Sequence, residues 1–203
     1  SHTLTISGIT RVDQSDATFL YYARENRVFT GIGAYRITGV NVAGAADGST
    51  SADSRAERLN AGLVSASTFP VLGATPILGR TFRDNEDRRD APRVAMLGQR
   101  LWERKFGADR GIIGRQISID GVPREIVGIM PADFDLPGAS TELWLPLGID
   151  PAHTASAAFD YRGVGRRRDG VSLDAAAADL QRLLPQVPEA YPGRLTAQSI
   201  QQI

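Results

Sequence analysis

Carboxylates gather in one segment of the chain, Phe82–Pro92 (FRDNEDRRDAP), and they are the side chains here most able to hold a metal ion. The four acids of this segment are Asp84, Glu86, Asp87 and Asp90. Ca²⁺ is bound by several such oxygens, but this spacing is not that of an EF-hand loop. Arginines of the same segment can neutralise the acids locally, so the pattern favours a solvated charged loop over a metal site.

Histidine and cysteine, the other common ligands and nucleophiles, are nearly absent. The chain has no cysteine and two histidines, His2 and His153. Metal sites and catalytic triads need several convergent groups, so the sequence nearly excludes both kinds of site. The pair Ser1-His2 is typical of a cloning remnant, and we therefore expect the chain to be a piece of a longer protein.

Two glycine-containing segments resemble anion sites at first sight. In Gly163–Gly170 (GVGRRRDG) the glycines fall in an expected strand, whereas a phosphate cradle needs them at a helix N-terminus. We interpret this segment as a strand with an exposed arginine edge, which would also deter unwanted strand pairing. The second segment, Phe106–Arg115 (FGADRGIIGR), is expected to be a helix stop followed by a short turn. The sequence contains no Walker-type loop for ATP.

Composition narrows the function further. The net charge is zero, which does not support a nucleic-acid partner, because such proteins usually carry a basic excess. Hydrophobic residues make up 42% of the chain and charged residues 23%, as in ordinary soluble domains. Apolar runs are far shorter than the ~20 residues of a membrane helix. No signal peptide is visible. The sequence assigns no catalytic, cofactor-binding or metal-binding residue, and no cofactor.

The elements between these segments alternate irregularly. A helix is expected over Ser15–Asn26, capped by Ser15 or Asp16. Strands are expected over Val28–Gly44, 55–65 and 93–97. A further strand is expected over ELWLPL, with three alternating leucines, Leu143, Leu145 and Leu147.

The segment Gly114–Pro131 predicts a β-hairpin. Its Asp120-Gly121 step suits a type I′ turn, in which both central residues take positive φ. The apolar run Ile126–Met130 after the turn can be buried on both faces of a sheet. No nucleophile or metal ligand accompanies the turn, so we interpret the hairpin as scaffold.

Two helices are expected in addition. One runs from Gly98 to Phe106, docks on the sheet through Leu101, Trp102 and Phe106, and ends at Gly107 with positive φ. Trp102 and Trp144 are both expected in the core.

The other helix begins at Ser172 and ends at Pro185. Its expected apolar face consists of four residues, Leu173, Ala176, Leu180 and Leu184. A last strand is expected over 194–203. Strands and helices that interleave without a repeat indicate the α+β class.

Five segments in this order carry a resemblance to a known family, and they span most of residues 25–184. They are ENRVFTGIGAYR, GLVSASTFPVLGATPILGRTF, APRVAMLGQRLWERKFGADRGIIGRQISIDGVPREIVGIMPADFDLP, ELWLPL and VGRRRDGVSLDAAAADLQRL. The chain resembles the MacB-like periplasmic core domain of bacterial ABC-transporter permeases of the FtsX-like group. Within that group it is most similar to acidobacterial-type permeases of unassigned substrate. At Arg124 the family more often has an aromatic residue, so an arginine stem is expected to replace a core contact.

The resemblance implies an extracytoplasmic, periplasmic domain of an inner-membrane protein with two lobes. Both chain ends would form a porter-like α/β lobe, 1–78 and 150–203, and a β-rich lobe, 79–149, would be inserted between them. The ends would return to the membrane together, so Leu4 and Ile200 are expected at one pole.

The partners that the resemblance implies are the protein's own membrane helices, a separate cytoplasmic ATPase subunit and a periplasmic partner protein. The permease would work as a pair in the membrane, whereas the isolated domain would be a monomer. The domain would be non-catalytic and would pass ATP-driven motion outward, for export or toward the periplasmic partner. The alternatives are a soluble ligand-binding or sensor module for a peptide or lipid, which needs an apolar pocket with convergent polar groups, and a hydrolase with a buried carboxylate pair.

Overall fold

The computed structural model describes residues 14–45, 56–150 and 160–191. Its helices are α1 (Asp16–Glu25), α2 (Thr68–Leu72), α3 (Gln99–Phe106), α4 (Leu173–Leu183) and α5 (Val187–Ala190). Its strands are β1 (Phe29–Ala45), β2 (Glu57–Val64), β3 (Leu78–Gly79), β4 (Val94–Gly98), β5 (Gln116–Ile119), β6 (Val122–Met130), β7 (Leu143–Pro146) and β8 (Arg162–Arg167). The chain thus has the α+β class expected of it.

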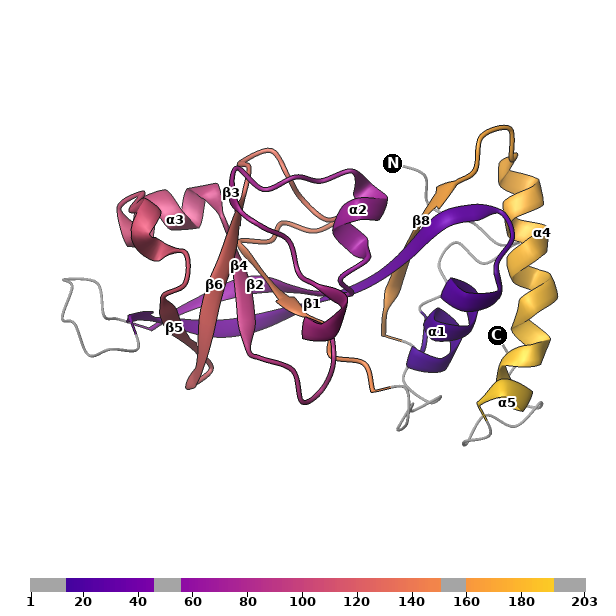
Figure 1. The fold of residues 1–203 in the computed structure, drawn as a ribbon, viewed down its shortest axis with the longest axis horizontal. Helices are drawn as coiled ribbons and strands as arrows, with labels where there is room; N and C mark the ends of the chain where they lie inside the picture. Colours follow the sequence, from indigo (N-terminus) through magenta and orange to yellow (C-terminus); the bar gives the residue numbers. More distant parts are fainter. Residues whose placement is uncertain (1–13, 46–55, 151–159, 192–203) are drawn as a thin grey trace.

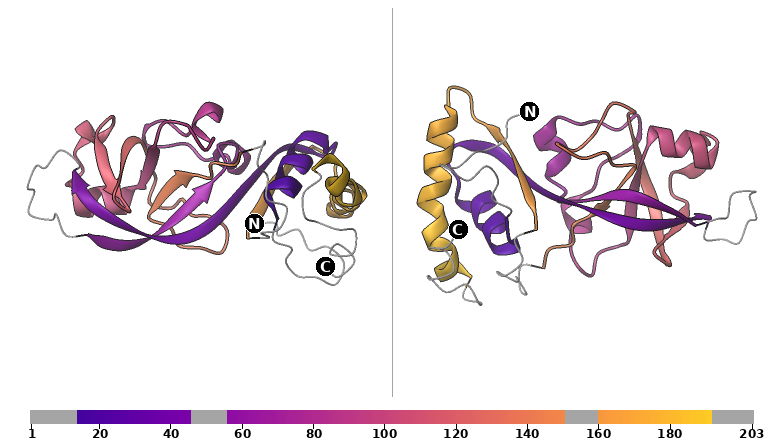
Figure 2. Two further views of the ribbon diagram at one scale, coloured as in Figure 1. Left: turned by 90° about the horizontal axis from the view of Figure 1, so that it is seen from below. Right: turned by 180° about the vertical axis from the view of Figure 1, so that it is seen from behind.

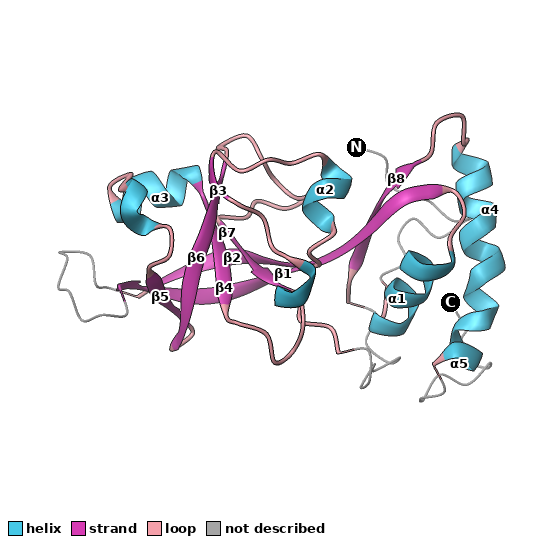
Figure 3. Ribbon diagram, in the orientation of Figure 1, coloured by secondary structure: helices cyan, strands magenta, loops and turns pink. Residues whose placement is uncertain are grey.

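The molecule is elongated and has two lobes that share the long strand β1 (Figure 1). In the β lobe, strand pairing closes on itself in the order β1–β2–β7–β4–β6–β5–β1. Most neighbours are antiparallel, whereas β2 with β7 and β4 with β6 are parallel. Beyond this ring, the first half of β1 pairs with β8 in the helical lobe, where α1, α4 and α5 lie on one side (Figure 3).

Both faces of β4, of β7 and of the second half of β6 are buried, because their side chains alternate between two cores. Ala95, Leu97, Ile126, Leu143 and Leu145 belong to one core, which α3 covers. The residues between them, including Met96, Val127 and Trp144, belong to the other, together with Phe69 of α2. The run Ile126–Met130 is therefore buried on both faces, as predicted.

The core of the helical lobe lies between the α1–α4 pair and the first half of β1. Ile32 and Ala34 project from β1 toward Phe19 and Tyr22 of α1 and Leu180 of α4. Figure 2 shows α1, α4 and α5 gathered at the end of the molecule opposite to α3. Segments from both ends of the described chain thus build this lobe.

Local signals at the ends of elements are confirmed. Ser15 caps α1, its Oγ accepting from the Thr18 amide. Asp120 and Gly121 have φ of 50° and 76°, as a type I′ turn requires. Gly107 ends α3 with φ of 61°. Leu101 and Trp102 are buried and Phe106 packs partly buried beside them, so the docking face of α3 is correct.

The predicted apolar face of the C-terminal helix is right at Ala176 and Leu180, with Leu184 partly buried against the same core, and wrong at Leu173. Leu173 is 44% exposed, whereas Leu183 is buried with Ala176 and Leu180. The buried positions continue to Val187 of α5, so the face steps by three and four residues from Ala176 onward. The predicted face is therefore kept from Ala176 onward, and only its first residue lies outside the core.

Arg124 is half-buried opposite Ile117 in the hairpin, and its Nε is buried without a hydrogen-bond partner. Burial lowers the pKa of its guanidinium.

Several predictions fall on residues outside the described ranges: the last strand 194–203, both histidines, and the placement of Leu4 and Ile200. The lobe boundaries at 78/79 and 149/150 stay a prediction. In space, the ring of strands also includes β2 and the second half of β1, which precede residue 79.

Candidate functional site

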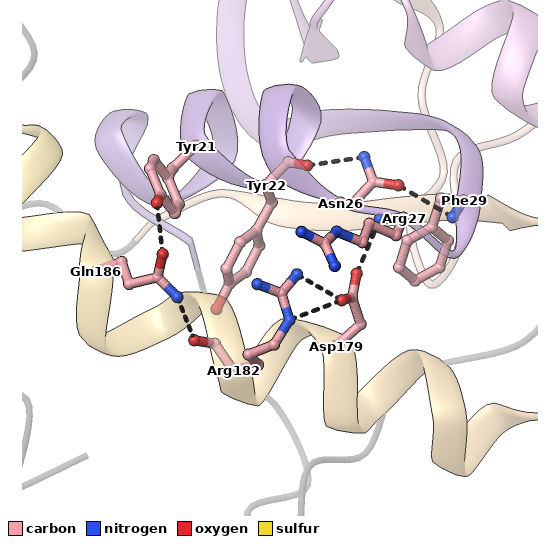
Figure 4. Close-up of polar contacts among 8 residues, drawn as sticks. All are labelled: Tyr21, Tyr22, Asn26, Arg27, Phe29, Asp179, Arg182 and Gln186. Carbon is pink, nitrogen blue, oxygen red and sulfur yellow. Dashed lines mark hydrogen bonds and ion pairs between the residues drawn. The ribbon is translucent and has the colours of Figure 1, made fainter.

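Polar contacts join the N-terminal and C-terminal helices of the helical lobe (Figure 4). The Arg27 amide, just after α1, donates to Asp179 Oδ2 on α4 at 2.9 Å. Tyr21 Oη of α1 donates to Gln186 Oε1, in the turn after α4, at 3.0 Å. These two ties and the apolar core between the helices hold segments more than 150 residues apart in one unit.

Asp179 is the centre of this cluster. Its side chain is only 9% exposed, and Oδ1 accepts from Arg182 Nη2 at 2.6 Å. Burial alone would raise the pKa of Asp179, but hydrogen bonds from the Arg27 amide and the Arg182 guanidinium outweigh it and lower the pKa. The carboxylate is therefore ionised at neutral pH and serves as a fixed anchor.

Asn26 connects the same helix to β1. Its Nδ2 donates to the Tyr22 carbonyl at 2.8 Å, and its Oδ1 accepts from the Phe29 amide at 3.0 Å. Asn26 thus adds a second hydrogen bond to the Tyr22 carbonyl, which its own backbone amide already contacts at 3.1 Å, and satisfies the first amide of β1. Tyr22 itself is buried, and burial raises the pKa of its phenol.

The acidic segment is the predicted solvated loop only in part, because Glu86 is buried and Asp87 is half-buried. Glu86 is buried and makes two hydrogen bonds with Arg80, at 2.7 and 2.6 Å, while the Arg83 amide donates to it at 2.9 Å. Burial would raise the pKa of Glu86, but these hydrogen bonds lower it. The arginine that forms the ion pair with Glu86, Arg80, precedes the segment, and Arg83 within it contributes a weaker favourable charge.

Asp87 ties two loops of the β lobe together. Its Oδ2 accepts from the Ala66 amide at 3.0 Å and its Oδ1 from the Gly148 amide at 2.8 Å. Burial raises the pKa of Asp87, and the backbone hydrogen bonds offset only part of that shift. Asp84 and Asp90, by contrast, are exposed, as predicted. Among the described residues, no three acids or histidines are grouped so that they could hold a metal ion.

A cavity of about 180 Å³ lies beside this loop, between α1 and the β lobe. Phe19, Ala66 and Ile149 give it apolar walls, and Asp87 and Arg88 lie at its polar side. Small-molecule sites usually have volumes of ~300–1,000 Å³. The cavity is too small to resemble a typical ligand pocket.

The arginine-rich strand is an edge strand, as predicted, since β8 ends the sheet order. Arg166 Nε donates to the Val71 carbonyl at the end of α2, at 2.9 Å, and Arg167 donates to the Val171 carbonyl. Two of its guanidinium groups are thus occupied by backbone carbonyls of the protein. The segment Phe106–Arg115 is also as predicted: after α3, Asp109 Oδ1 caps a short turn by accepting from the Gly111 amide at 2.8 Å.

The chain matches one known family over most of its length. The model of the MacB-like periplasmic core domain family matches residues 3–183. The chain belongs to this family. It is therefore a periplasmic domain of an ABC-transporter permease, located outside the cytoplasm on a membrane protein. No described helix is both long and apolar enough to cross a membrane.

Curated relatives of this family member are much longer proteins. The pyoverdine export ATP-binding/permease protein PvdT of Pseudomonas entomophila is 30% identical over 108 residues, 47% of this chain and 16% of the relative. The macrolide export ATP-binding/permease protein MacB of Burkholderia cenocepacia is 30% identical over 125 residues, 61% and 18% of the respective chains. The chain therefore spans less than a fifth of their length.

Solved structures show the same fold. The periplasmic region of MacB from Actinobacillus actinomycetemcomitans matches with a TM-score of 0.65 at 12% identity, over 97% of this chain and 85% of that one. The extracellular domain of the noncanonic ABC-type transporter YknZ from Gram-positive bacteria gives 0.58 at 13% identity, over 90% and 86%. These matches show that the MacB-like fold is kept despite very different sequences.

Proposed function

We propose that this domain is a non-catalytic coupling element. It passes ATP-driven motion of the membrane helices to the periplasmic side, for export or toward a periplasmic partner protein. The observation that carries the proposal is the tie between α1 and α4: helices near the two ends of the described chain share one core and the Asp179 contacts. Displacement of either chain end would move the whole lobe.

ATP chemistry would take place outside this chain, because the sequence has no phosphate loop. A separate cytoplasmic ATPase subunit is one arrangement. The names of PvdT and MacB combine ATP binding and permease in one protein, and that arrangement serves the same mechanism. In either case the permease would act as a pair in the membrane, with the isolated domain a monomer.

The test uses the full-length permease in lipid nanodiscs, with native cysteines elsewhere replaced. The described domain has no cysteine of its own, so Arg100→Cys on the exposed side of α3 gives one labelling position per copy. We expect ATP with Mg²⁺ to change the spin–spin distance between the two copies, and a chain carrying Leu180→Asp to lose that response while it still hydrolyses ATP.

The matched control is Gln181→Ala, on the exposed face next to Leu180. It should respond as the parent does. A parent permease that hydrolyses ATP with no change in distance would contradict the coupling function. A distance change produced by a peptide or lipid, and not by ATP, would favour the ligand-binding alternative.

A further inference from the structure

Helix α2 belongs to the β lobe by its core and by its position in the chain, yet it rests on the sheet of the helical lobe. Phe69 is fully buried in the β lobe, in edge contact with Phe82 at 5.6 Å between ring centres. From the same helix, Thr68 and Val71 face the first half of β1. Figure 1 shows α2 at the place where β1 leaves the β lobe.

The contact depends on two glycines of β1. A Cβ on Gly33 would lie 2.7 Å from Thr68 Cα, and one on Gly31 would lie 2.9 Å from Val71 Cγ2. Both distances are shorter than carbon atoms can approach, so α2 packs directly against the backbone of β1. On the opposite face of the strand, Ile32 and Ala34 contact the α1–α4 core. This part of β1 is therefore held between a helix of the β lobe and the helices of the other lobe.

Hydrogen bonds reinforce the same contact. Thr68 Oγ1 donates to the Ala34 carbonyl at 3.1 Å, and Ser65 Oγ accepts from the Ala34 amide at 3.0 Å. The Ser65 and Thr68 hydroxyls also bond each other at 3.0 Å, and both side chains are buried. If α2 moved away, the buried Thr68 hydroxyl would lose the Ala34 carbonyl and the Ser65 hydroxyl as partners, which is costly in a protein interior.

The second strand of the helical lobe also holds α2. Arg166 of β8 donates to the Val71 carbonyl at 2.9 Å, satisfying a carbonyl that the end of the helix leaves free. One short helix thus contacts both strands of the helical lobe while its phenylalanine is fixed in the other lobe.

We propose that α2 locks the two lobes into one rigid body, so that this domain works as a stiff lever without a hinge between its lobes. The inference rests on the proposed coupling function and specifies its mechanics. A strand that alone joined two lobes could bend, and hinge motion needs only a few residues that change φ and ψ. With α2 seated on the strand, a tilt of α1 and α4 reaches the far end of the β lobe undiminished.

The test measures the distance between lobes in the 203-residue chain by double electron–electron resonance. Because the chain has no cysteine, Arg100→Cys on α3 and Gln181→Cys on α4 place one nitroxide on each lobe. A second pair, Ala23→Cys with Gln181→Cys, lies within the helical lobe and reports whether that lobe stays folded. We expect one narrow interlobe distance in the parent chain.

Gly33→Ala forces α2 off the strand and should widen the interlobe distribution about twofold or add a second population, with the intralobe pair unchanged. The matched control is Gly39→Ala in the same strand, where a Cβ would meet only the movable guanidinium of Arg58. It should leave the distribution narrow. The double variant Arg166→Met, Val71→Ala removes contacts of α2 without adding atoms to the strand. If Gly33→Ala does not fold, the interlobe distribution of this double variant, which should also widen, tests the proposal.

A broad distribution of interlobe distances in the parent chain would overturn the proposal. So would a distribution that stays narrow both in Gly33→Ala and in the double variant Arg166→Met, Val71→Ala. The measurement contains no membrane and no nucleotide. A rigid domain that nevertheless fails to respond to ATP in the full-length permease would refute the coupling function alone.

Discussion

Truncation of Trp102 tests whether α3 is part of the core or a contact surface for a partner. The indole is 9% exposed, packs in the core under α3, and donates from Nε1 to the Asp109 carbonyl at 2.9 Å. Trp102→Ala removes both the packing and the hydrogen bond. Large core truncations cost ~3–5 kcal/mol. At ~2–4 °C per kcal/mol for a chain of this size, the melting temperature should fall by about 6–20 °C.

Trp102→Phe separates the two contributions, because it keeps an aromatic ring and loses the donor. A hydrogen bond contributes ~0.5–1.5 kcal/mol, so the loss should be well below that of the alanine variant. Arg100→Ala, on the exposed side of the same helix, should change stability by less than ~0.5 kcal/mol. Thermal unfolding followed by circular dichroism measures all three.

The rival explanation is that Trp102 is an anchor for a partner protein, since tryptophan is enriched at binding hot spots. In that case Trp102→Ala would weaken binding and leave the melting temperature nearly unchanged. A decrease of less than ~2 °C would therefore refute the assignment of Trp102 to the core.

Three further predictions concern metals, pH and backbone conformation. The purified chain should show no ATPase activity, and EDTA should leave its melting temperature unchanged; a chelator-sensitive transition would contradict this. Because burial raises the pKa of Asp87, the folded state holds that proton more tightly than the unfolded state, so the contribution of Asp87 to stability should fall as pH rises from ~3.9 through the raised pKa. The free energy of unfolding in urea can be measured against pH for the parent and for Asp87→Asn. The parent's value minus the variant's should fall over this window, and a difference that rises with pH would contradict the prediction. Gly121 has φ of 76° with open space around it, so Gly121→Ala should cost ~1–2 kcal/mol through backbone strain alone, whereas Gly39→Ala, in extended backbone, should not show that loss in the same thermal assay.

Features that depend on a few neighbouring residues could be predicted from the sequence. Ser15 as a cap, Asp120-Gly121 as a turn and Gly107 as a helix stop each follow from the conformational preferences of one or two residues. The docking face of α3 was also predictable, because Leu101, Trp102 and Phe106 leave only one apolar side.

Features that depend on distant partners could not be predicted. The pair Asp179 and Arg182 is visible at helical spacing, but the Arg27 amide that completes the cluster lies 152 residues away in sequence. Likewise, Asp87 looked solvated because its partner at Gly148 is 61 residues distant. The apolar face of α4 was predicted at Ala176 and Leu180, but the sequence did not show that Leu173 is exposed and that the face continues to Val187.

The sharing of β1 between lobes also sets an order for biosynthesis. β1 is made early and pairs with β2 soon after, but its other edge waits for β8; Thr30 meets Arg166 across 136 residues. At ~5–20 residues per second, the ribosome needs about 1–4 s to pass from Pro146, which completes the ring of strands, to Arg167. During that interval the first half of β1 has an unpaired edge and the apolar face of α1 has no α4 to cover it. A nascent or truncated chain that stops before β8 would thus present an unpaired, aggregation-prone strand edge. Chaperones and proteases would be expected to act on such a chain.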